Sequence, residues 1–273
     1  MKKSWINDKS ILITGASSGI GRELVKKLII NNNCKVLGIA RNEQKMQDLM
    51  LELGDKKSNF TYKLLDISVE DSWIALKDSI NFDIDIIINN AGVLPPFSSF
   101  DKFINDKENC DEVHKVINTN FMSAVYSVKY LSEKIEQSTT PAIINVASSA
   151  GLCALPGISI YSASKSALKN FTESIMLERN YYISYICPGF TLTDIFRNQT
   201  RNYDSKLIKM ISTPLNKMSN KIYKGIIKKK KRMVFGFDAK IMDWCYRHFP
   251  KLSLKIFKNV MKRANIDLFK DIF

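Results

Sequence analysis

The chain lacks the long apolar run that a membrane-spanning helix needs: no stretch of about 18 or more apolar residues occurs in its 273 residues. Its first residues carry two lysines but no apolar segment behind them, so we expect no signal peptide. The five cysteines are scattered, odd in number and without a Cys-x-x-Cys pair. We therefore expect reduced thiols in a cytoplasmic protein, and neither a disulfide framework nor a zinc site.

Histidine is equally scarce, and the two that occur, His114 and His248, are isolated with no third ligand. We predict neither a metal site nor a catalytic histidine. Acidic residues are outnumbered: 41 Lys and Arg against 27 Asp and Glu give a formal charge of +14. This charge fits nucleic acid, an anionic membrane surface or anionic ligands, and equally compositional drift or plain solubility. No nucleic-acid-binding module is recognisable, so nucleic acid is not an expected partner.

What the chain does contain begins with a phosphate-binding pattern. Ser10–Thr14 is a short apolar run that predicts a buried strand, and Gly15–Gly21 follows with the spacing Gly-x-x-x-Gly-x-Gly. Arg22–Ile30 then carries apolar residues at helical spacing. Glycines let the backbone approach a pyrophosphate, and the helix N-terminus stabilises its charge. The pattern predicts a dinucleotide site, with a tight strand-to-helix turn that binds nothing as the alternative.

Arg41 directly follows a second predicted strand, Lys35–Ala40. In a nucleotide-binding β-α-β unit this position faces the adenosine ribose, where an acid binds the 2′-hydroxyl and an arginine accommodates a 2′-phosphate. Arg41 therefore favours NADP(H), with NAD(H) as the alternative cofactor and a solvated loop arginine as the alternative interpretation. Asp66, at the end of the third strand, is placed to accept a hydrogen bond from an adenine amino group or to cap the next helix.

Strands alternate with helices along the chain, which predicts an α/β fold. We expect a Rossmann-like, doubly wound, seven-stranded parallel sheet with helices on both faces. An irregular surface loop is expected over Val93–Asp111, followed by a long helix from Asp111 to Glu136 with Asn120 inside it. The remaining strands are predicted at Phe60–Leu65, Ile84–Ile88, Ala142–Ala147, Tyr182–Cys187 and Met233–Phe237.

Tyr161 and Lys165 lie four residues apart in Ile160–Leu177, a run that predicts a helix. Residues at this spacing share one helix face, about 5–6 Å apart at Cβ. A tyrosine hydroxyl titrates near about pH 10, and a nearby positive charge lowers its pKa toward the range of acid–base catalysis. The pair is a catalytic candidate, although chance often places a half-buried tyrosine beside a solvated lysine. Ser148 ends the fifth strand, at the edge where such sheets bind ligands.

In their order and spacing these motifs resemble the short-chain dehydrogenase/reductase family in its common single-domain form. Ser148 lies thirteen residues before Tyr161, the separation usual in that family. The resemblance covers about residues 8–195 with firm motifs. These are Thr14–Gly21, Asn89–Gly92, Ser148, Tyr161-x-x-x-Lys165, and Pro188-Gly189 through Thr193.

The resemblance implies a role for each catalytic candidate. Tyr161 would protonate a carbonyl oxygen, or act as the base in the reverse direction, and Ser148 would hold that oxygen by a hydrogen bond. Lys165 would lower the pKa of Tyr161 and bind the nicotinamide ribose. Asn120 would hold a water that links Lys165 to solvent.

The resemblance also implies the cofactor contacts and an assembly. Relatives commonly pair through the helix that carries the tyrosine and the helix before it, which implies a homo-oligomer, a dimer or a tetramer. The implied contacts are Gly15, Ser17, Ser18, Gly19, Ile20 and Gly21 at the pyrophosphate and adjoining ribose, Asp66 and Ile67 at the adenine, Asn90, Ala91 and Gly92 in the central cleft, Tyr161 and Lys165 near the nicotinamide, and Pro188, Gly189 and Thr193 near its carboxamide.

The last third of the chain is divided into a lid and an extension. Residues 1–237 are expected to form one NAD(P)-binding domain, in which residues 191–222 resemble the family's substrate-binding lid. Residues 238–273 alternate apolar and basic side chains and predict two basic amphipathic helices broken at Pro250. Such helices can lie on an anionic membrane surface, cover the substrate cleft or contact another subunit. The predicted apolar wall of the lid is Ile195, Phe196, Leu207, Ile208, Met210 and Ile211.

Taken together, the sequence predicts an NADP(H)-dependent oxidoreductase that interconverts a carbonyl and an alcohol on a fairly apolar small molecule by hydride transfer. It is expected in the cytoplasm, with peripheral membrane contact as an alternative. A 3-oxoacyl reductase of lipid synthesis is the alternative enzyme, and a dinucleotide-binding regulator without turnover is the alternative outside enzymes. Ser148, Tyr161 and Lys165 favour an enzyme, because a sensor needs the glycine turn and not the acid.

Overall fold

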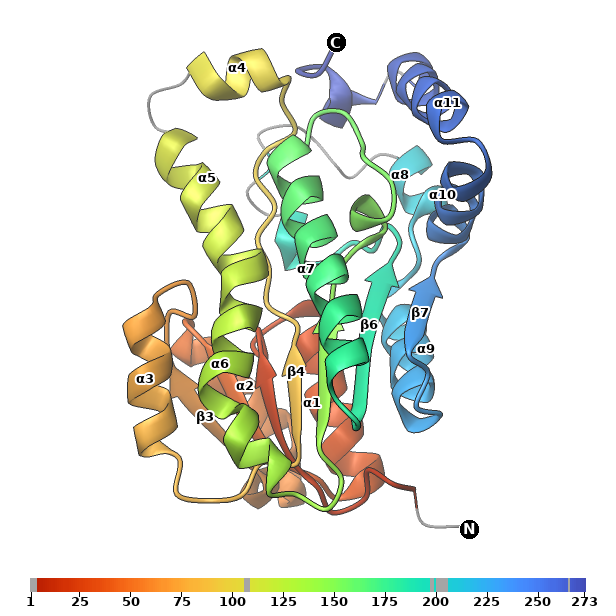
Figure 1. Cartoon of the computed structure of the whole chain (residues 1–273). Coiled ribbons are helices and arrows are strands. Elements are labelled where there is room, and N and C mark those ends of the chain that lie inside the picture. The colour runs from red at the N-terminus through yellow and green to blue at the C-terminus, as the bar shows by residue number, and fades with distance from the viewer. Residues whose placement is uncertain (1–3, 106–108, 197–198, 200–205, 265) are drawn as a thin grey trace.

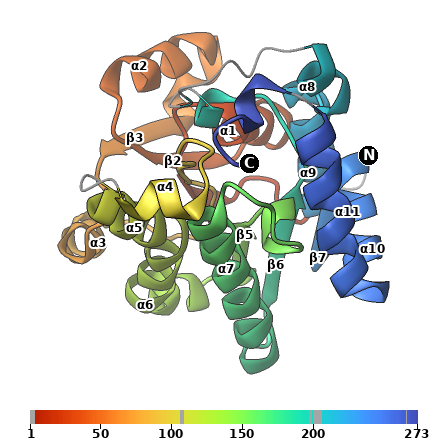
Figure 2. The ribbon, with the colours of Figure 1, turned by 90° about the horizontal axis from the view of Figure 1, so that it is seen from above.

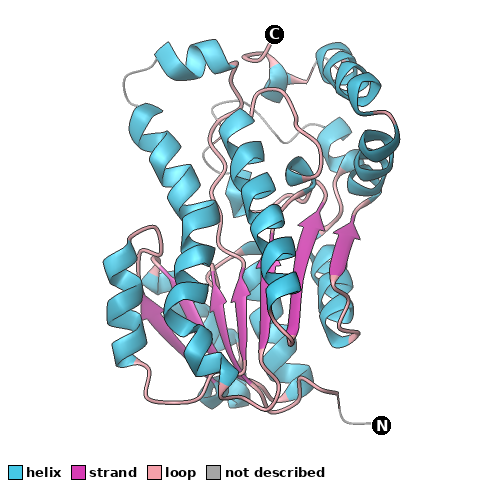
Figure 3. Cartoon of the chain, in the orientation of Figure 1, coloured by secondary structure: helices cyan, strands magenta, loops and turns pink. Residues whose placement is uncertain are grey.

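The computed structural model describes residues 4–105, 109–196, 199, 206–264 and 266–273. Within these ranges seven parallel strands form one sheet in the order β3-β2-β1-β4-β5-β6-β7, which confirms the predicted doubly wound architecture (Figure 1, Figure 3). The strands are β1 (Ser10–Thr14), β2 (Lys35–Ala40), β3 (Phe60–Leu64), β4 (Ile86–Asn89), β5 (Ala142–Val146), β6 (Tyr182–Pro188) and β7 (Arg232–Phe235).

Helices cover both faces of the sheet. The described helices are α1 (Gly19–Asn32), α2 (Glu43–Glu52), α3 (Glu70–Ser79), α4 (Phe100–Asn105), α5 (Asn109–Ile117), α6 (Ser123–Glu136), α7 (Ser159–Glu178), α8 (Lys206–Ile211), α9 (Leu215–Ile227), α10 (Phe237–His248) and α11 (Pro250–Arg263). Successive strand side chains point to opposite faces, so a sheet covered on both sides needs apolar residues at consecutive positions. In β1, Ile11 and Ile13 pack toward α1, α2 and α9, whereas Leu12 packs toward α3, α6 and α7.

The helix predicted from Asp111 to Glu136 is interrupted. Between α5 and α6 the chain forms a π-helical turn over Asn118–Met122. Such a turn accommodates an extra residue and is frequent at functional sites. Here it contains Asn120, whose amide oxygen accepts from the N–H of Val93 (2.7 Å) and whose amide nitrogen donates to the Val93 carbonyl (2.9 Å). The residues buried in and just after the turn include Thr119, Asn120 and Ser123, which are polar, so no apolar pattern in the sequence predicted it.

Other boundaries also differ from prediction; the fourth strand, for example, is Ile86–Asn89 and not Ile84–Ile88. The predicted irregular loop Val93–Asp111 contains the short helix α4, and its residues 106–108 lie outside the described ranges. The last strand ends at Phe235 and not at Phe237, because Gly236 turns the backbone at a φ of +113° and Phe237 starts α10.

The two predicted C-terminal helices, α10 and α11, are present, and Pro250 is the first residue of the second. Proline suits this position, where a helix has no use for its N–H. The residues after α11 return across the carboxyl edge of the sheet, as Figure 2 shows from above. Met261 and Leu268 pack there with Leu94, which follows β4. The extension therefore closes the same edge of the sheet at which the candidate site lies. Among the helices described, none is long and apolar enough to cross a membrane.

Candidate active site

The turn between β1 and α1 depends on glycine. Gly15 and Gly19 adopt φ values of +68° and +53°, which favour glycine, and a Cβ on Gly21 would lie 2.2 Å from the carbonyl oxygen of Gly15. Ser18 is the N-cap of α1 but makes no side-chain hydrogen bond to it, so the N–H groups of the first turn keep their capacity for an anion. The backbone therefore has the form that a phosphate requires.

Asn90, predicted to line the central cleft, also fixes the glycine turn. Its amide nitrogen donates to the carbonyl oxygens of Thr14 (3.0 Å) and Gly15 (3.3 Å). The hydroxyl oxygen of Thr14 accepts in return from the backbone N–H groups of Asn90 (3.0 Å) and Ala91 (3.1 Å). These four bonds join the ends of β1 and β4 beneath the cleft.

Arg41 and Asp66 meet at the end where the adenosine was predicted. The guanidinium lies 3.6 Å from the carboxylate, and the arginine side chain is 61% exposed. Burial alone would raise the pKa of Asp66, but hydrogen bonds from the N–H and hydroxyl of Ser68, followed by the attraction of Arg41, leave this pKa below its ordinary value. Asp66 is therefore a charged acceptor beside an accessible cation.

A second cation at this end was not predicted from the sequence. Lys45 of α2 lies 2.5 Å from Asp194 in the lid. The neighbouring Thr193 approaches the glycine turn closely, since a Cβ on Gly19 would lie 3.2 Å from the Cβ of Thr193. The lid is thus held against the glycine turn. No local pattern could have shown this, because Lys45 and Asp194 are far apart in the chain.

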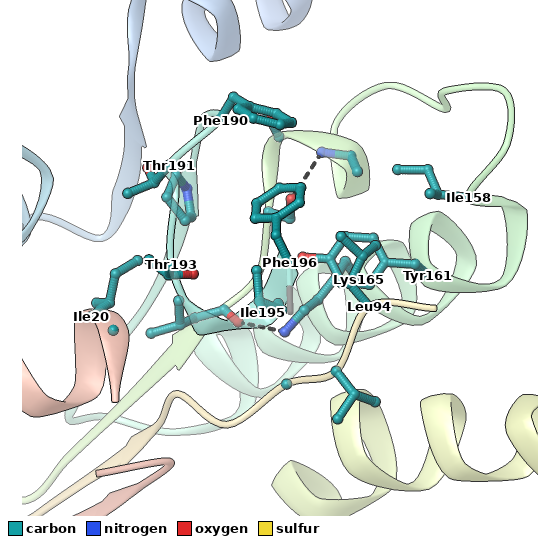
Figure 4. A pocket seen from close by; sticks show the side chains of 18 of the residues that line it. Ile20, Leu94, Ile158, Tyr161, Lys165, Phe190, Thr191, Thr193, Ile195 and Phe196 are labelled. Atoms are coloured by element: carbon teal, nitrogen blue, oxygen red, sulfur yellow. Dashed lines mark hydrogen bonds between the residues drawn. The ribbon is translucent and has the colours of Figure 1, made fainter. Parts of the chain in front are cut away.

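Tyr161 and Lys165 lie in the first turns of α7 (Figure 4). Ser148 follows the carboxyl end of β5, and all three residues are buried at one cavity. The hydroxyl of Ser148 is a hydrogen-bonding partner of the Tyr161 phenol and accepts from the N–H of Ala150 at 3.2 Å. The ammonium of Lys165 donates to the carbonyl oxygen of Val146 at 3.0 Å. The three predicted catalytic residues therefore share one buried site.

Burial shifts the pKa values of two of these groups in opposite directions. It raises the pKa of Tyr161 above its ordinary value, although the hydrogen bond with Ser148 opposes the rise. It lowers the pKa of Lys165 to about 8. The shift of Tyr161 runs opposite to the lowered pKa that the family resemblance implies. The physical reason is the dry surroundings of the phenol, together with a lysine whose hydrogen bond goes to Val146.

Asn120 sits behind the site. Besides its two bonds to Val93, it donates to the hydroxyl of Ser164 at 3.1 Å, and Ser164 donates to the carbonyl oxygen of Tyr161. Gly92 lies between Asn120 and Lys165, because a Cβ there would come within 3.3 Å of the Asn120 amide oxygen and 3.1 Å of the Lys165 ammonium. Asn120 thus fastens the loop after β4 to α7 and keeps Gly92 against Lys165.

One cavity of about 670 Å³ joins these groups. It runs from the adenosine end, past the glycine turn, to the buried serine, tyrosine and lysine. Its lining includes every predicted cofactor-binding residue except Gly21, which lies beneath the turn, and it does not include Asn120. The predicted residues on its wall are Gly15, Ser17, Ser18, Gly19, Ile20, Arg41, Asp66, Ile67, Asn90, Ala91, Gly92, Ser148, Tyr161, Lys165, Pro188, Gly189 and Thr193.

A sequence profile described as "short chain dehydrogenase" matches residues 9–204. The chain belongs to the short-chain dehydrogenase/reductase family. It is thus an oxidoreductase that acts on CH–OH groups with NAD(P). A benzil reductase ((S)-benzoin forming) of Saccharomyces cerevisiae is 36% identical to it over 175 residues, which cover 62% of this chain and 65% of the yeast enzyme, just under two thirds of the latter's length.

Two solved structures share the fold of this short-chain dehydrogenase. One, from Sphingobium yanoikuyae in complex with NADPH, has a TM-score of 0.74 and 20% identity, covering 90% of this chain and 95% of that one. Another, from Burkholderia phymatum in complex with NAD, has a TM-score of 0.72 and 19% identity, covering 98% of each chain.

The far end of the cavity in this dehydrogenase is apolar. Figure 4 shows the side chains of Leu94, Ile158 and Phe196 around Tyr161. These three residues and Tyr161 belong to one buried cluster. Of the predicted lid wall, Ile195, Phe196, Ile208 and Ile211 line the cavity. Met210 does not: it is largely exposed, on the outer side of α8. The side chain of Leu207 and residues 197–198 and 200–205 of the lid lie outside what the structure describes.

The sequence reasoning missed several residues of this apolar end. They come from the extension. Its apolar spacing predicted amphipathic helices, for which covering the substrate cleft was one of three alternative roles. The extension residues on the cavity wall are Asp238, Ile241, Met242, Phe257, Val260, Met261, Ala264, Ile266 and Phe269.

Asp238 is the one acidic group that the extension adds to the cavity. Its carboxylate accepts from the N–H of Phe190 at 2.6 Å and would collide with any side chain on Gly189. Its second oxygen is buried with no protein partner among the described residues, and burial raises its pKa. Asp238 therefore holds the backbone just after β6, where the predicted carboxamide contacts lie.

Proposed function

We propose that this dehydrogenase uses NADP(H) to interconvert a carbonyl and an alcohol on an apolar small molecule. The observation that carries the proposal is the cavity that joins a phosphate-binding turn and Arg41 to a buried Ser148–Tyr161–Lys165 group. A second cation, Lys45, pairs with Asp194 of the cavity wall. Neither half would suffice alone, because a dinucleotide site binds without reacting and an acid without a hydride donor cannot reduce a carbonyl.

The residues present fit a dinucleotide. Gly21 has no room for a side chain because the backbone of Gly15 packs directly against it, which keeps the turn tight, and α1 offers its N-terminus there. Arg41 and Lys45 supply positive charge beside the adenosine end, which suits a 2′-phosphate. Since one structural relative holds NADPH and another holds NAD, the preference for NADP(H) rests on these two cations.

The remaining contacts follow the order of the cavity wall. Asp66 and Ile67 would meet the adenine, and Asn90, Ala91 and Gly92 would line the middle of the cofactor. The backbone at Pro188 and Gly189, with Thr193 of the lid, would meet the carboxamide. When bound, the nicotinamide supplies the hydride, and the chain supplies orientation and electrostatic stabilisation.

Tyr161 is the proton donor in this proposal. In reduction, the carbonyl carbon gains a hydride and its oxygen gains the phenol proton, while Ser148 donates a hydrogen bond to that oxygen as negative charge develops on it. The raised pKa of Tyr161 keeps the phenol protonated at neutral pH, which is the form that reduction needs. Lys165 would bind ribose hydroxyls and, once charged, favour the phenolate that remains.

The substrate end favours an apolar molecule. Leu94, Ile158 and Phe196 surround the phenol, and Phe190 packs on Phe196 with ring centroids 4.7 Å apart. Burial of apolar substrate surface against such a wall stabilises the complex by about 25 cal/mol per Å². The yeast relative's name, a benzil reductase, agrees with an apolar carbonyl compound as the substrate class.

The test is NADPH oxidation with a graded panel of apolar ketones. Tyr161→Phe should lower kcat by about a hundredfold or more, while the Kd for NADPH stays within about twofold because the phenyl ring remains. Tyr130→Phe is the matched control, since its hydroxyl binds Glu70 at 2.6 Å, outside the cavity. Unchanged turnover in Tyr161→Phe would refute the proposal, and NADPH binding by a wild type that reduces no ketone would favour a dinucleotide-binding regulator.

A further inference from the structure

Two apolar stripes lie on the outside of the C-terminal helices. Phe237, Ile241 and Trp244 are spaced along α10, and Leu252, Ile256 and Val260 along α11, at intervals that place each set on one helix face. All six side chains are between 40% and 80% exposed. The two helices lie side by side at one edge of the molecule (Figure 2). We call these six residues the α10–α11 face.

The fold does not need this face. α11 rests on the domain through a different stripe, Ser253, Phe257 and Met261, the most buried positions of that helix. The neighbouring stripe of Leu252, Ile256 and Val260 is left in solvent although it is equally apolar. Exposed apolar side chains gathered on two neighbouring helices mark an interaction site more often than a chance feature.

The charge around the face has one sign. Lys240, Lys251, Lys255, Lys258, Lys262 and Arg263 form no ion pair with any residue that the structure describes. The two acidic residues of α10 are turned inward: Asp238 binds the backbone of Phe190, and Asp243 binds Arg232. The partner of the face must therefore be apolar within and negatively charged at its border.

The face is also continuous with the substrate end of the cavity. Ile241 and Val260 belong to the exposed stripes and line the cavity as well. Phe257, which follows Ile256 and lies about one turn from Val260, lines it too. Whatever covers the α10–α11 face thus lies against the rim of the cavity beside the catalytic group.

We propose that the α10–α11 face docks on an anionic lipid bilayer, so that the cavity opens against the membrane and an apolar substrate passes from it to Tyr161. Amphipathic helices with basic borders bind in this way, through apolar burial and attraction to anionic headgroups. A second copy of the chain is a poorer occupant, because its face would bring the same six cations against these six. The passage of substrate rests on the proposed function; the docking does not.

The experiment uses the full chain with vesicles of phosphatidylcholine, with or without phosphatidylglycerol. Sedimentation should show binding to the anionic vesicles, weaker in high salt and weaker still to the neutral ones. Trp244 is 55% exposed whereas Trp73 is fully buried, so binding should shift tryptophan emission to shorter wavelength. In Trp244→Phe this shift should be lost.

Leu252→Asp/Ile256→Asp is the decisive variant, since neither residue lines the cavity and both are already exposed. It should raise the Kd for anionic vesicles about tenfold or more. Leu51→Asp/Leu177→Asp makes the same chemical change at exposed sites on α2 and α7 and should bind like the wild type. Failure of the wild type to bind anionic vesicles overturns the proposal, as does equal loss in both double variants.

Further measurements separate docking from the proposed function. With a water-soluble ketone and no vesicles, Leu252→Asp/Ile256→Asp should turn over like the wild type; with a bilayer-dissolved ketone, its rate should fall below that of the wild type. If the wild type reduces no ketone but still binds vesicles through this face, the proposed function fails and the docking stands. If light scattering shows that the variant dissociates a wild-type oligomer while vesicle binding is unchanged, a second copy occupies the face and the proposal is wrong.

Discussion

The walls at the two ends of the cavity differ in how far backbone and side chains form them. At the cofactor end the phosphate-binding part of the wall is a backbone turn, shaped by glycines that tolerate no side chain and fastened by Asn90 and Thr14. At the substrate end it is side chain, contributed by the loop after β4, the lid and the extension. A backbone wall fits one ligand and does not adapt, whereas a side-chain wall can change its shape by substitution.

This difference explains how one scaffold serves many substrates. The cofactor end must hold the same pyrophosphate in every reaction, and a methyl group added to Gly15 or Gly21 would collide with the protein atoms that shape the turn. The substrate end is held together by apolar contacts between segments that are distant in the chain, such as Leu94, Ile208 and Leu268. We therefore expect substitutions at the cofactor end either to abolish cofactor binding or to leave it intact. Substitutions at the substrate end should change substrate affinity gradually.

The strongest test of this comparison adds one methyl group to a glycine of the turn and, as a control, to a glycine outside it. In Gly21→Ala the new Cβ would lie 2.2 Å from the backbone oxygen of Gly15, so the turn must rearrange. We expect NADPH affinity to fall by about a hundredfold or more, near 3 kcal/mol, in a fluorescence titration. Gly54→Ala is the control: its φ of +54° makes alanine cost some stability, but nothing lies within 4 Å of the new Cβ and Gly54 does not line the cavity, so the Kd should not change. A Gly21→Ala variant with normal affinity would show that the backbone wall adapts after all.

The second prediction concerns the free energy of unfolding, which the burial of Lys165 should lower. Burial lowers the pKa of Lys165 to about 8 from an ordinary value of 10.5, so the folded state holds this proton less tightly than the unfolded state does. Below about pH 8 the lysine is charged in both states, and folding must bury that charge. The cost to folding is then about 3 kcal/mol, and it disappears as the pH rises from about 8 to 10.5.

Lys165→Met should remove that cost. In urea unfolding at several pH values the variant should exceed the wild type in stability by up to about 3 kcal/mol at pH 7, and the gap should close toward about pH 10. Tyrosines and buried cysteines with raised pKa values affect both proteins alike, so the difference between the curves reports Lys165. A gap that is constant with pH would mean that the lysine is not titrating as its burial predicts.

A smaller effect is expected at the exposed adenosine end. Arg41→Ala should weaken NADPH binding about tenfold, because a charge-assisted hydrogen bond to the 2′-phosphate is lost, and should change NADH binding little. Arg179→Ala is a matched control, since Arg179 pairs with Glu136 away from the cavity. Equal losses for both cofactors would assign Arg41 to the adenosine as a whole and remove the argument for NADP(H).

The contrast between the two ends also decides how much the sequence could predict. The sheet order, the glycine turn and the meeting of Ser148, Tyr161 and Lys165 follow from strands and short motifs, whose spacing fixes local geometry. Arg41 beside Asp66 was predictable as well, because both residues end neighbouring parallel strands.

What the sequence could not show depends on contacts between distant segments. Lys45 and Asp194 meet only because the lid folds back over α2, and Met261 reaches the cavity only because the extension crosses the sheet edge. The raised pKa of Tyr161 is of the same kind, since it reflects the summed burial by several elements. The π turn at Asn120 could not be predicted either, because Thr119, Asn120 and Ser123, which are buried there, are polar and form no apolar pattern.

The smallest effect should come from the side-chain wall itself. Met261 is buried, lines the cavity and packs in the cluster that contains Tyr161, so Met261→Ala enlarges the substrate end without touching the cofactor end. We expect KM for a small ketone to rise about fivefold, near 1 kcal/mol of lost contact, and KM for a bulkier ketone to rise less or to fall.

KM for NADPH should not change in this variant. Leu252→Ala makes a comparable truncation on the same helix outside the cavity and should leave both ketones unaffected. If Met261→Ala altered NADPH binding as strongly as ketone binding, the two ends would be mechanically coupled. The division of the cavity into a fixed backbone wall and an adjustable side-chain wall would then be wrong.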